Sequence, residues 1–218
     1  MWRQEVKMGT NQTLDVQMCF KTILKALKGE DKHIIERVSV FEVIDKIPKL
    51  KDVEGIFNLD EKHIQYILYK ALLRTGDYQV YMEDSYEEGE EKFCDITVYT
   101  NDWRESLWIE IKTTGWCTEG NYRRWVKADA EKLIALSRKG ARKYLLVTSI
   151  EDGKQDGTEW NEWFEKEFQE VKFDPNLFGS FFPANSKTER KLLKVSMLCV
   201  SCRAKPNEQK REIEWLNQ

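Results

Sequence analysis

The sequence predicts an α/β protein, with a mixed central β-sheet flanked by helices and a helical extension at the N-terminus. Apolar residues recur at helical spacing in the first third of the chain, and β-rich segments replace that pattern over 78–113. A further helical pattern over 122–139 precedes the nearly continuous apolar run KYLLVTSI, Lys143–Ile150. Because a helix between two strands is typical of a parallel crossover, we expect a parallel strand beside an antiparallel meander.

The N-terminal helices are predicted from periodicity and from the residues that begin and end helices. A first helix covers Leu14–Leu27 and ends at Gly29, and a second covers 33–50. Asp60 is placed to cap a third, amphipathic helix, Glu61–Arg74.

The remaining elements follow in order. The three consecutive strands are Tyr78–Met82, Phe93–Thr100 and Leu107–Thr113. In the helix over 122–139, the inward residues are predicted to be Trp125, Ala128, Leu133 and Leu136, with Gly140 after its end. Another helix is predicted over residues 158–170, and a last strand is predicted over Leu192–Cys202.

Length and composition indicate an ordinary globular protein. A chain of 218 residues, with 41% apolar and 33% charged residues, fits one compact unit: an N-terminal helical extension (1–58) and an α/β domain (59–218). No apolar run is long enough to cross a membrane, and no signal peptide is recognisable, so we expect a cytoplasmic protein. Cys199 and Cys202 have ligand-like spacing, but no second pair accompanies them, which favours core thiols over a zinc site.

Basic residues are segregated along the chain although the net charge is −3. They gather in the segments 121–143 and 184–211, while acidic residues gather over 83–91 and 151–170. Such segregation permits a basic face for a polyanion. The alternative is that these charges are only the solvated faces of helices.

One Glu-x-Lys pattern stands apart from the others in the chain. In LWIEIKTT, Glu110 and Lys112 alternate with apolar residues on a predicted strand, so both side chains lie on one face. If residues 101–106 form the hairpin loop, Asp95 on the preceding strand lies opposite Lys112, and Thr97 opposite Glu110. A slip of one residue would move Asp95 to the other face.

Two carboxylates that converge in a partly buried sheet need compensation. At roughly 4 Å their repulsion is about 4 kcal/mol at an effective dielectric constant near 20. A divalent ion such as Mg²⁺ would offset it, since Mg²⁺ binds one or two carboxylates together with water and phosphate oxygens. Lys112 would then orient or deprotonate the attacking water and stabilise the phosphate. The alternative is an exposed Asp95–Lys112 pair with Glu110 merely solvated.

The segment CDITVY…LWIEIKTT resembles the PD-(D/E)xK nuclease superfamily, over about residues 60–150. The resemblance maps the first acid of the motif onto Asp95 and the E-x-K onto Glu110 and Lys112. Cys94 stands where the motif name has Pro, a departure that many members share. The resemblance implies a restriction-endonuclease-like core. It also implies a Mg²⁺-dependent endonuclease, with Mn²⁺ as a substitute, that acts on DNA in restriction, defence, repair or recombination.

The resemblance also suggests further site residues. Glu61 and Glu83 are candidates for an additional metal-binding acid, although a first-turn helix acid or an exposed acidic cluster explains them equally well. The segment Asp129–Leu133 resembles a helix that flanks the site in some members. Nucleic-acid contacts are expected from the basic residues of this helix, Arg123, Arg124, Lys127 and Lys132, and from Trp103 at the hairpin tip.

Two other functions stay open. An inert nuclease-like fold would bind nucleic acid or a protein partner without cutting it, but binding alone does not need both acids beside Lys112. An enzyme acting on another phosphate ester is less favoured, since no glycine-rich phosphate loop is present. The sequence does not separate DNA from RNA. A homodimer would suit cleavage of both strands of a duplex, although no residue indicates one.

Overall fold

The computed structural model describes residues 13–45, 56, 59–86, 92–113, 119–136, 138, 140–152, 166, 171–182 and 191–200. The helices are α1 (Val16–Asp45), α2 (Glu61–Leu73), α3 (Glu119–Ala135) and the short 3₁₀ helix η3 (Pro175–Leu177). The strands are β1 (Gln79–Ser85), β2 (Phe93–Tyr99), β3 (Ser106–Thr113), β4 (Ala141–Asp152), β5 (Val171–Lys172), β6 (Phe178–Phe181) and β7 (Lys191–Val200).

The strands form one mixed, seven-stranded sheet, which confirms the predicted α/β class. Its order is β1-β2-β3-β4-β7-β5, and β6 also pairs with β7. The pair β3–β4 is parallel and the other pairs are antiparallel, so α3 is the predicted crossover between two parallel strands. No helix of the described residues is long and apolar enough to cross a membrane.

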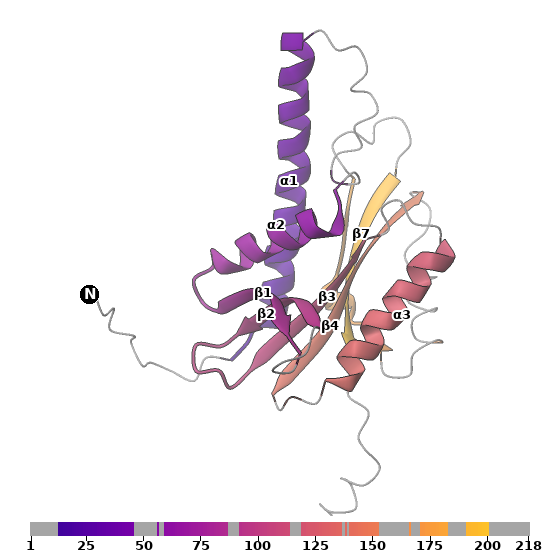
Figure 1. Ribbon diagram of the computed structural model, residues 1–218. Coiled ribbons are helices and arrows are strands. Elements are labelled where there is room, and N and C mark those ends of the chain that lie inside the picture. The colour runs from indigo at the N-terminus through magenta and orange to yellow at the C-terminus, as the bar shows by residue number, and fades with distance from the viewer. Residues whose placement is uncertain are drawn as a thin grey trace, which may run out of the picture.

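Helices cover both faces of this sheet (Figure 1). On one face, α1 and α2 pack on residues such as Ile96, Ile109 and Val195, and together they form the larger hydrophobic core. On the other face, α3 packs on a second core that contains Trp108 and Leu145. Because α1 shares its core with α2 and the sheet, the packing does not mark a boundary at residue 58, and the proposed division into 1–58 and 59–218 stays a prediction.

A single long helix replaces the first two predicted helices. α1 continues through Gly29 to Asp45, so the predicted end at Gly29 was wrong. A glycine inside a helix costs only about 1 kcal/mol relative to alanine, which tertiary contacts on either side offset. Beyond Gly29, the buried Asp31 accepts a hydrogen bond from the backbone N–H of Ile56 at 3.2 Å. Residues 46–50 of the predicted second helix lie outside the described residues.

The register of β2 and β3 differs from the predicted one by two residues. Ile96 pairs with Ile109 and Tyr99 with Ser106, so the hairpin loop is 100–105 rather than 101–106. Trp103, with φ of 60°, donates its backbone N–H to the carbonyl of Thr100 at 2.9 Å, which closes the loop early. Since the shift is an even number, the paired residues Ile96–Tyr99 stay on their predicted faces. Cys94 instead lies in the core under α3, whereas Ile96 lies in the core under α1 and α2, so the alternation of β2 breaks at Asp95.

The other predicted elements agree to different degrees. Asp60 caps α2 by accepting the backbone N–H of His63 at 2.7 Å, as predicted. The helix expected over 158–170 lies outside the described residues except for Lys166, which is helical. The short strands β5 and β6 were not predicted, because neither is long enough to show an alternating pattern.

Candidate active site

Asp95 lies where the regular pairing of β2 is interrupted. Met82 and Asp84 on β1 pair with Ile96 and Cys94, but Glu83 between them has φ of 54° and does not pair with Asp95. Two other hydrogen bonds hold Asp95 instead. The backbone carbonyl of Asp95 accepts from Gln65 Nε2 on α2 at 2.6 Å. Its carboxylate Oδ2 accepts the backbone N–H of Ile111 at 2.8 Å, which brings the acid beside the Glu110–Ile111 peptide of β3.

Glu110 is an almost completely buried acid, with 2% of its surface exposed. Its Oε1 accepts a hydrogen bond from the Tyr86 hydroxyl and lies 3.8 Å from Lys132 Nζ. Burial, together with the neighbouring Asp129 and Asp95, raises the pKa of Glu110 to about 9. Tyr86 and Lys132 lower this pKa, but by less. Glu110 is therefore protonated at neutral pH until a cation compensates its charge.

Lys112 connects the two helical layers. Its Nζ lies 3.0 Å from Glu61 Oε1 at the start of α2 and 2.8 Å from Asp129 Oδ2 on α3. Burial of the ammonium opposes its charge, but Asp129 and Glu61 outweigh burial, so the pKa of Lys112 is above its usual value. Lys112 is consequently a fixed cation at neutral pH, which suits stabilisation of an anion and argues against the proton-accepting role considered for it above.

Asp129 is the acid that sequence reasoning did not assign to the site. The face predicted to point inward from α3 was partly wrong: Trp125, 43% exposed, and Ala128 point outward, while Val126 and Asp129 point inward. The buried Asp129 is compensated by Lys112 and by Lys132, whose Nζ lies 2.5 Å from its Oδ1. A hydropathy pattern places an acid outside, so only the positions of the two lysines could have indicated this orientation.

The site therefore combines four carboxylates, of Glu61, Asp95, Glu110 and Asp129, with the ammonium groups of Lys112 and Lys132. If all were ionised, four negative and two positive charges would leave a net charge of −2. Burial raises the pKa of Glu61 despite the nearby Lys112, and Asp95 and Asp129 add to the rise. The acids are thus under-compensated by protein cations alone.

The excess negative charge and the oxygen ligands of this cluster suit a hard divalent cation. Asp95 and Glu110 offer oxygen ligands, which Mg²⁺ and Mn²⁺ prefer, and Mg²⁺ usually keeps several water ligands. Within the ranges that the structure describes, no three His, Cys, Asp or Glu side chains are arranged around a common point for a metal. The residues therefore fit a cation held by two carboxylates, with water and substrate oxygens as the remaining ligands.

The neighbouring Gln65 is a further residue that sequence reasoning missed. It is completely buried, and its Nε2 supports the Asp95 backbone. Its Oε1 has no hydrogen-bond partner among the described residues, which is costly for a buried polar atom. The signal in the sequence is a polar residue between Ile64 and Leu68, on the apolar face of the predicted helix.

The other predicted site residues lie outside this cluster. Glu83 is exposed and forms an ion pair with Lys62, without a direct contact to the four acids among the described residues. Arg124 and Lys127 are exposed on α3, whereas nothing is described of the Arg123 side chain. Trp103, 53% exposed, lies at the other end of the β2–β3 hairpin and packs on Tyr81 and Tyr99.

Several cations of the basic segment 121–143 form contacts with other residues of the chain. Arg138 Nη1 donates to the Tyr99 hydroxyl at 3.2 Å, and Arg142 Nη2 lies 2.9 Å from Glu105 Oε2. Lys143 is buried and donates to the carbonyl of Leu136. Of these three residues, Lys143 is buried, whereas Arg138 and Arg142 remain exposed.

Comparison with known proteins does not add a relative to this picture. The resemblance of Asp95, Glu110 and Lys112 to the PD-(D/E)xK motif therefore stays a prediction, and the functional argument depends on the geometry of the residues. No protein-family model matches the chain, and neither a curated protein nor a solved structure shows significant similarity to it.

Proposed function

We propose that this protein is a metal-dependent nuclease that hydrolyses phosphodiester bonds in DNA, with Mg²⁺ as its cofactor and Mn²⁺ as a substitute. The observation that carries the proposal is the convergence of the buried Glu110 with Asp95 beside the cationic Lys112. Structural ion pairs do not require a carboxylate that is buried beside two other acids, whereas perturbed groups of this kind concentrate at functional sites.

The proposed roles follow from the contacts of each residue. Asp95 and Glu110 would hold the divalent ion, which supplies an activated water and polarises a phosphate oxygen when bound. Lys112 would stabilise the negative charge that develops on the phosphate, and Glu61 and Asp129 hold its ammonium in place for this. An ion pair on each side leaves Lys112 little freedom, so little reorganisation is needed during the reaction.

The buried proton of Glu110 gives the site a dependence on pH. A carboxylate must be ionised to bind a cation, so cation and proton compete for Glu110. Because the pKa of Glu110 is about 9 in the folded protein, the apparent affinity for Mg²⁺ should rise with pH across the neutral range. Activity should rise in parallel as long as metal binding limits it.

DNA is the proposed substrate because exposed cations flank the acid cluster. Arg124 and Lys127 lie on α3, the helix that supplies Asp129, and would contact backbone phosphates together with Arg123. Trp103 would stack on a base where the substrate is single-stranded. A homodimer remains part of the proposal for duplex cleavage, and the broader role would be in restriction, defence, repair or recombination.

A second candidate is a nuclease-like scaffold that binds nucleic acid or a protein partner without cutting it. The observation that favours it is that the two lysines already compensate half of the acidic charge, and Lys132 contacts both Asp129 and Glu110. In that case the acids and lysines are a structural network, and a divalent cation would not displace Lys132 from Glu110.

Cleavage and metal binding measured together separate the two functions. The substrates are supercoiled plasmid, linear duplex, single-stranded DNA and RNA, each with Mg²⁺, Mn²⁺ or EDTA. The test variants are Asp95→Asn and Glu110→Gln, and Glu131→Gln is the matched control, since Glu131 is exposed on α3. We expect metal-dependent DNA cleavage by the parent and the control, and a loss of at least about a hundredfold in both test variants. Undiminished cleavage by either test variant would exclude the proposed ligands. Absence of calorimetric Mn²⁺ binding to the parent would favour the scaffold.

A further inference from the structure

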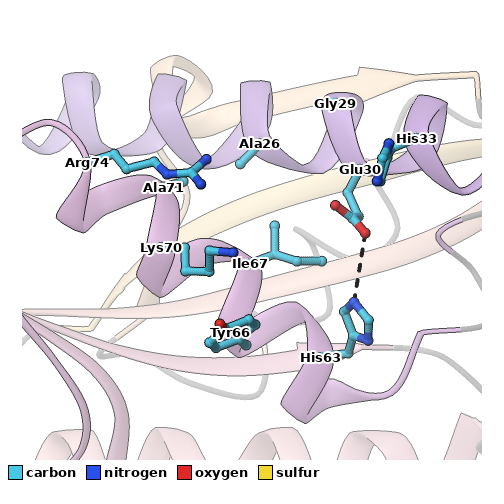
Figure 2. A pocket seen from close by; sticks show the side chains of 10 residues that line it. All are labelled: Ala26, Gly29, Glu30, His33, His63, Tyr66, Ile67, Lys70, Ala71 and Arg74. Carbon is cyan, nitrogen blue, oxygen red and sulfur yellow. Dashed lines mark ion pairs between the residues drawn. The ribbon is translucent and has the colours of Figure 1, made fainter.

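A groove of about 420 Å³ lies between α1 and α2 (Figure 2), and none of its lining residues belongs to the acid cluster. Small residues line part of it: Ala26 and Gly29 on α1, and Ala71 on α2. Because these side chains are short, the two helices leave open space between them where larger residues would interdigitate. The volume is within the range of small-molecule sites.

Gly29 is the least expected of these small residues. It lies inside a 30-residue helix, where glycine is less favourable than alanine. A Cβ atom built on Gly29 would meet no other atom within 4 Å, so no close approach of a neighbour requires glycine here. Gly29 therefore faces open space, and a large side chain at this position would fill part of the groove.

The rim of the groove is mainly basic. Lys70 and Arg74 on α2 extend into the space between the helices, as Figure 2 shows, and no acidic side chain of the described residues forms an ion pair with either. His33 and His63, the two histidines of the chain, also line it. The acidic lining residue is Glu30, whose Oε1 lies 3.8 Å from His63 Nε2. Such a rim attracts an anion.

An aromatic ring completes the lining. Tyr66 is 50% exposed, and Lys70 Nζ lies 5.1 Å from the centroid of its ring. A flat ring next to a cation is the arrangement that binds a nucleotide: a base stacks on the ring while the phosphate meets the cation. A bare phosphate would not use Tyr66, and an apolar ligand would not use Lys70 and Arg74.

We infer that this groove is a nucleotide-binding site, with the phosphate at Lys70 and Arg74 and the base against Tyr66. The nucleotide is either free or one unit of a single strand. Glu61, which contacts Lys112, belongs to the same helix as these residues, so a strand held in the groove lies along the helix that leads to the candidate active site. The inference does not rest on catalysis, since none of the groove residues belongs to the acid cluster.

The test uses the full chain in EDTA, with calorimetric titration of deoxyadenosine monophosphate, deoxyadenosine, inorganic phosphate and single-stranded hexadeoxyadenylate. We expect the monophosphate to bind at least about tenfold more tightly than deoxyadenosine or phosphate, since it engages both parts of the groove. A hexadeoxyadenylate affinity well above that of the monophosphate identifies a strand as the ligand, and equal affinities identify a free nucleotide.

The key variants are Gly29→Leu, which fills the groove, and Gly29→Ala, which adds one methyl group. Both should melt at or above the temperature of the parent, because each replaces a helix glycine. Only Gly29→Leu should lose monophosphate binding. Lys70→Gln with Arg74→Gln should weaken binding about tenfold and reduce its salt dependence, whereas Lys25→Gln, an exposed charge on α1 outside the groove, should change neither.

Two outcomes would overturn the inference. One is the absence of monophosphate binding by the parent chain. The other is equal affinity of Gly29→Leu and Gly29→Ala for the monophosphate. If Gly29→Leu does not fold, the exposed-residue variant Tyr66→Ala takes its place, and a loss of less than about fivefold in affinity then counts against the site. Glu110→Gln should bind the monophosphate like the parent, so that failure of the nuclease proposal is distinguishable from failure of this one.

Discussion

Replacing Glu110 by Gln should stabilise the metal-free protein, and more so as the pH rises. Burial, with Asp129 and Asp95, raises the pKa of Glu110 from an ordinary value of 4.5 to about 9. Between these values the folded protein keeps the proton and the unfolded chain releases it. Raising the pH therefore favours unfolding, and this contribution to stability is fully present below pH 4.5 and lost as the pH passes through 9.

The magnitude follows from the width of that interval. Each pH unit within it lowers the free energy of unfolding by roughly 1.4 kcal/mol, so about 3 kcal/mol is lost between pH 4.5 and pH 7. Gln has the shape of Glu and does not ionise, so Glu110→Gln avoids this loss and can still accept the hydrogen bond from Tyr86. The variant and the parent should be nearly equal in stability near pH 5 and diverge above it.

Urea unfolding in EDTA at several pH values from 5 to 9 measures the effect, with Glu131→Gln as the control. Parallel stability profiles of the parent and Glu110→Gln would show that Glu110 is already ionised at neutral pH and held by Lys132. At pH 8, saturating Mg²⁺ at a hundredfold excess over its dissociation constant should stabilise the parent by about 2.7 kcal/mol. It should leave Glu110→Gln nearly unchanged.

Two further predictions concern the cations. Lys112→Ala should reduce the free energy of unfolding by about 3 kcal/mol, because the buried Asp129 loses a partner, and adding Asp129→Asn should restore much of it in urea unfolding. In the same variant Mn²⁺ affinity should persist, since an ammonium is no ligand, while cleavage falls about a hundredfold; unchanged cleavage would make Lys112 purely structural. Replacing Arg124 and Lys127 by Gln should flatten the salt dependence of duplex binding by about one unit of slope per lost contact. An unchanged slope in a salt titration would show that both charges face only solvent.

Much of the fold was predictable because it depends on local pattern. The cap of α2 by Asp60 and the parallel crossover through α3 both follow from residues close in sequence. The placement of Glu110 and Lys112 two residues apart on one face of β3 is equally local. It does not depend on how β3 pairs with β2, so the register error of two residues did not affect it.

The incorrect predictions concern residues whose placement depends on distant partners. The end of a helix at Gly29 was a sound local inference, but contacts such as the one between Asp31 and Ile56 continue α1 beyond it. Asp129 points inward because Lys112, on a strand, lies beneath it. Hydropathy assigns Asp129 to the surface and the apolar Trp125 to the core. In the structure Asp129 is buried and Trp125 is exposed.

Glu110 and Gly29 are two positions at which a different residue would make the folded protein more stable. A glutamine at residue 110 would keep the contact with Tyr86 and avoid the repulsion from Asp95 and Asp129. An alanine at residue 29 would strengthen α1, and its methyl group would touch nothing. Natural proteins accept such losses where binding or chemistry requires them. In the proposals above, a cation completes the site of the buried acid, and a ligand occupies the groove beside Gly29. The two losses are independent of each other: one belongs to the sheet face under α3 and the other to the contact between α1 and α2. Glu110→Gln should therefore stabilise the metal-free protein and abolish cleavage while sparing monophosphate binding. Gly29→Leu should abolish monophosphate binding while sparing cleavage.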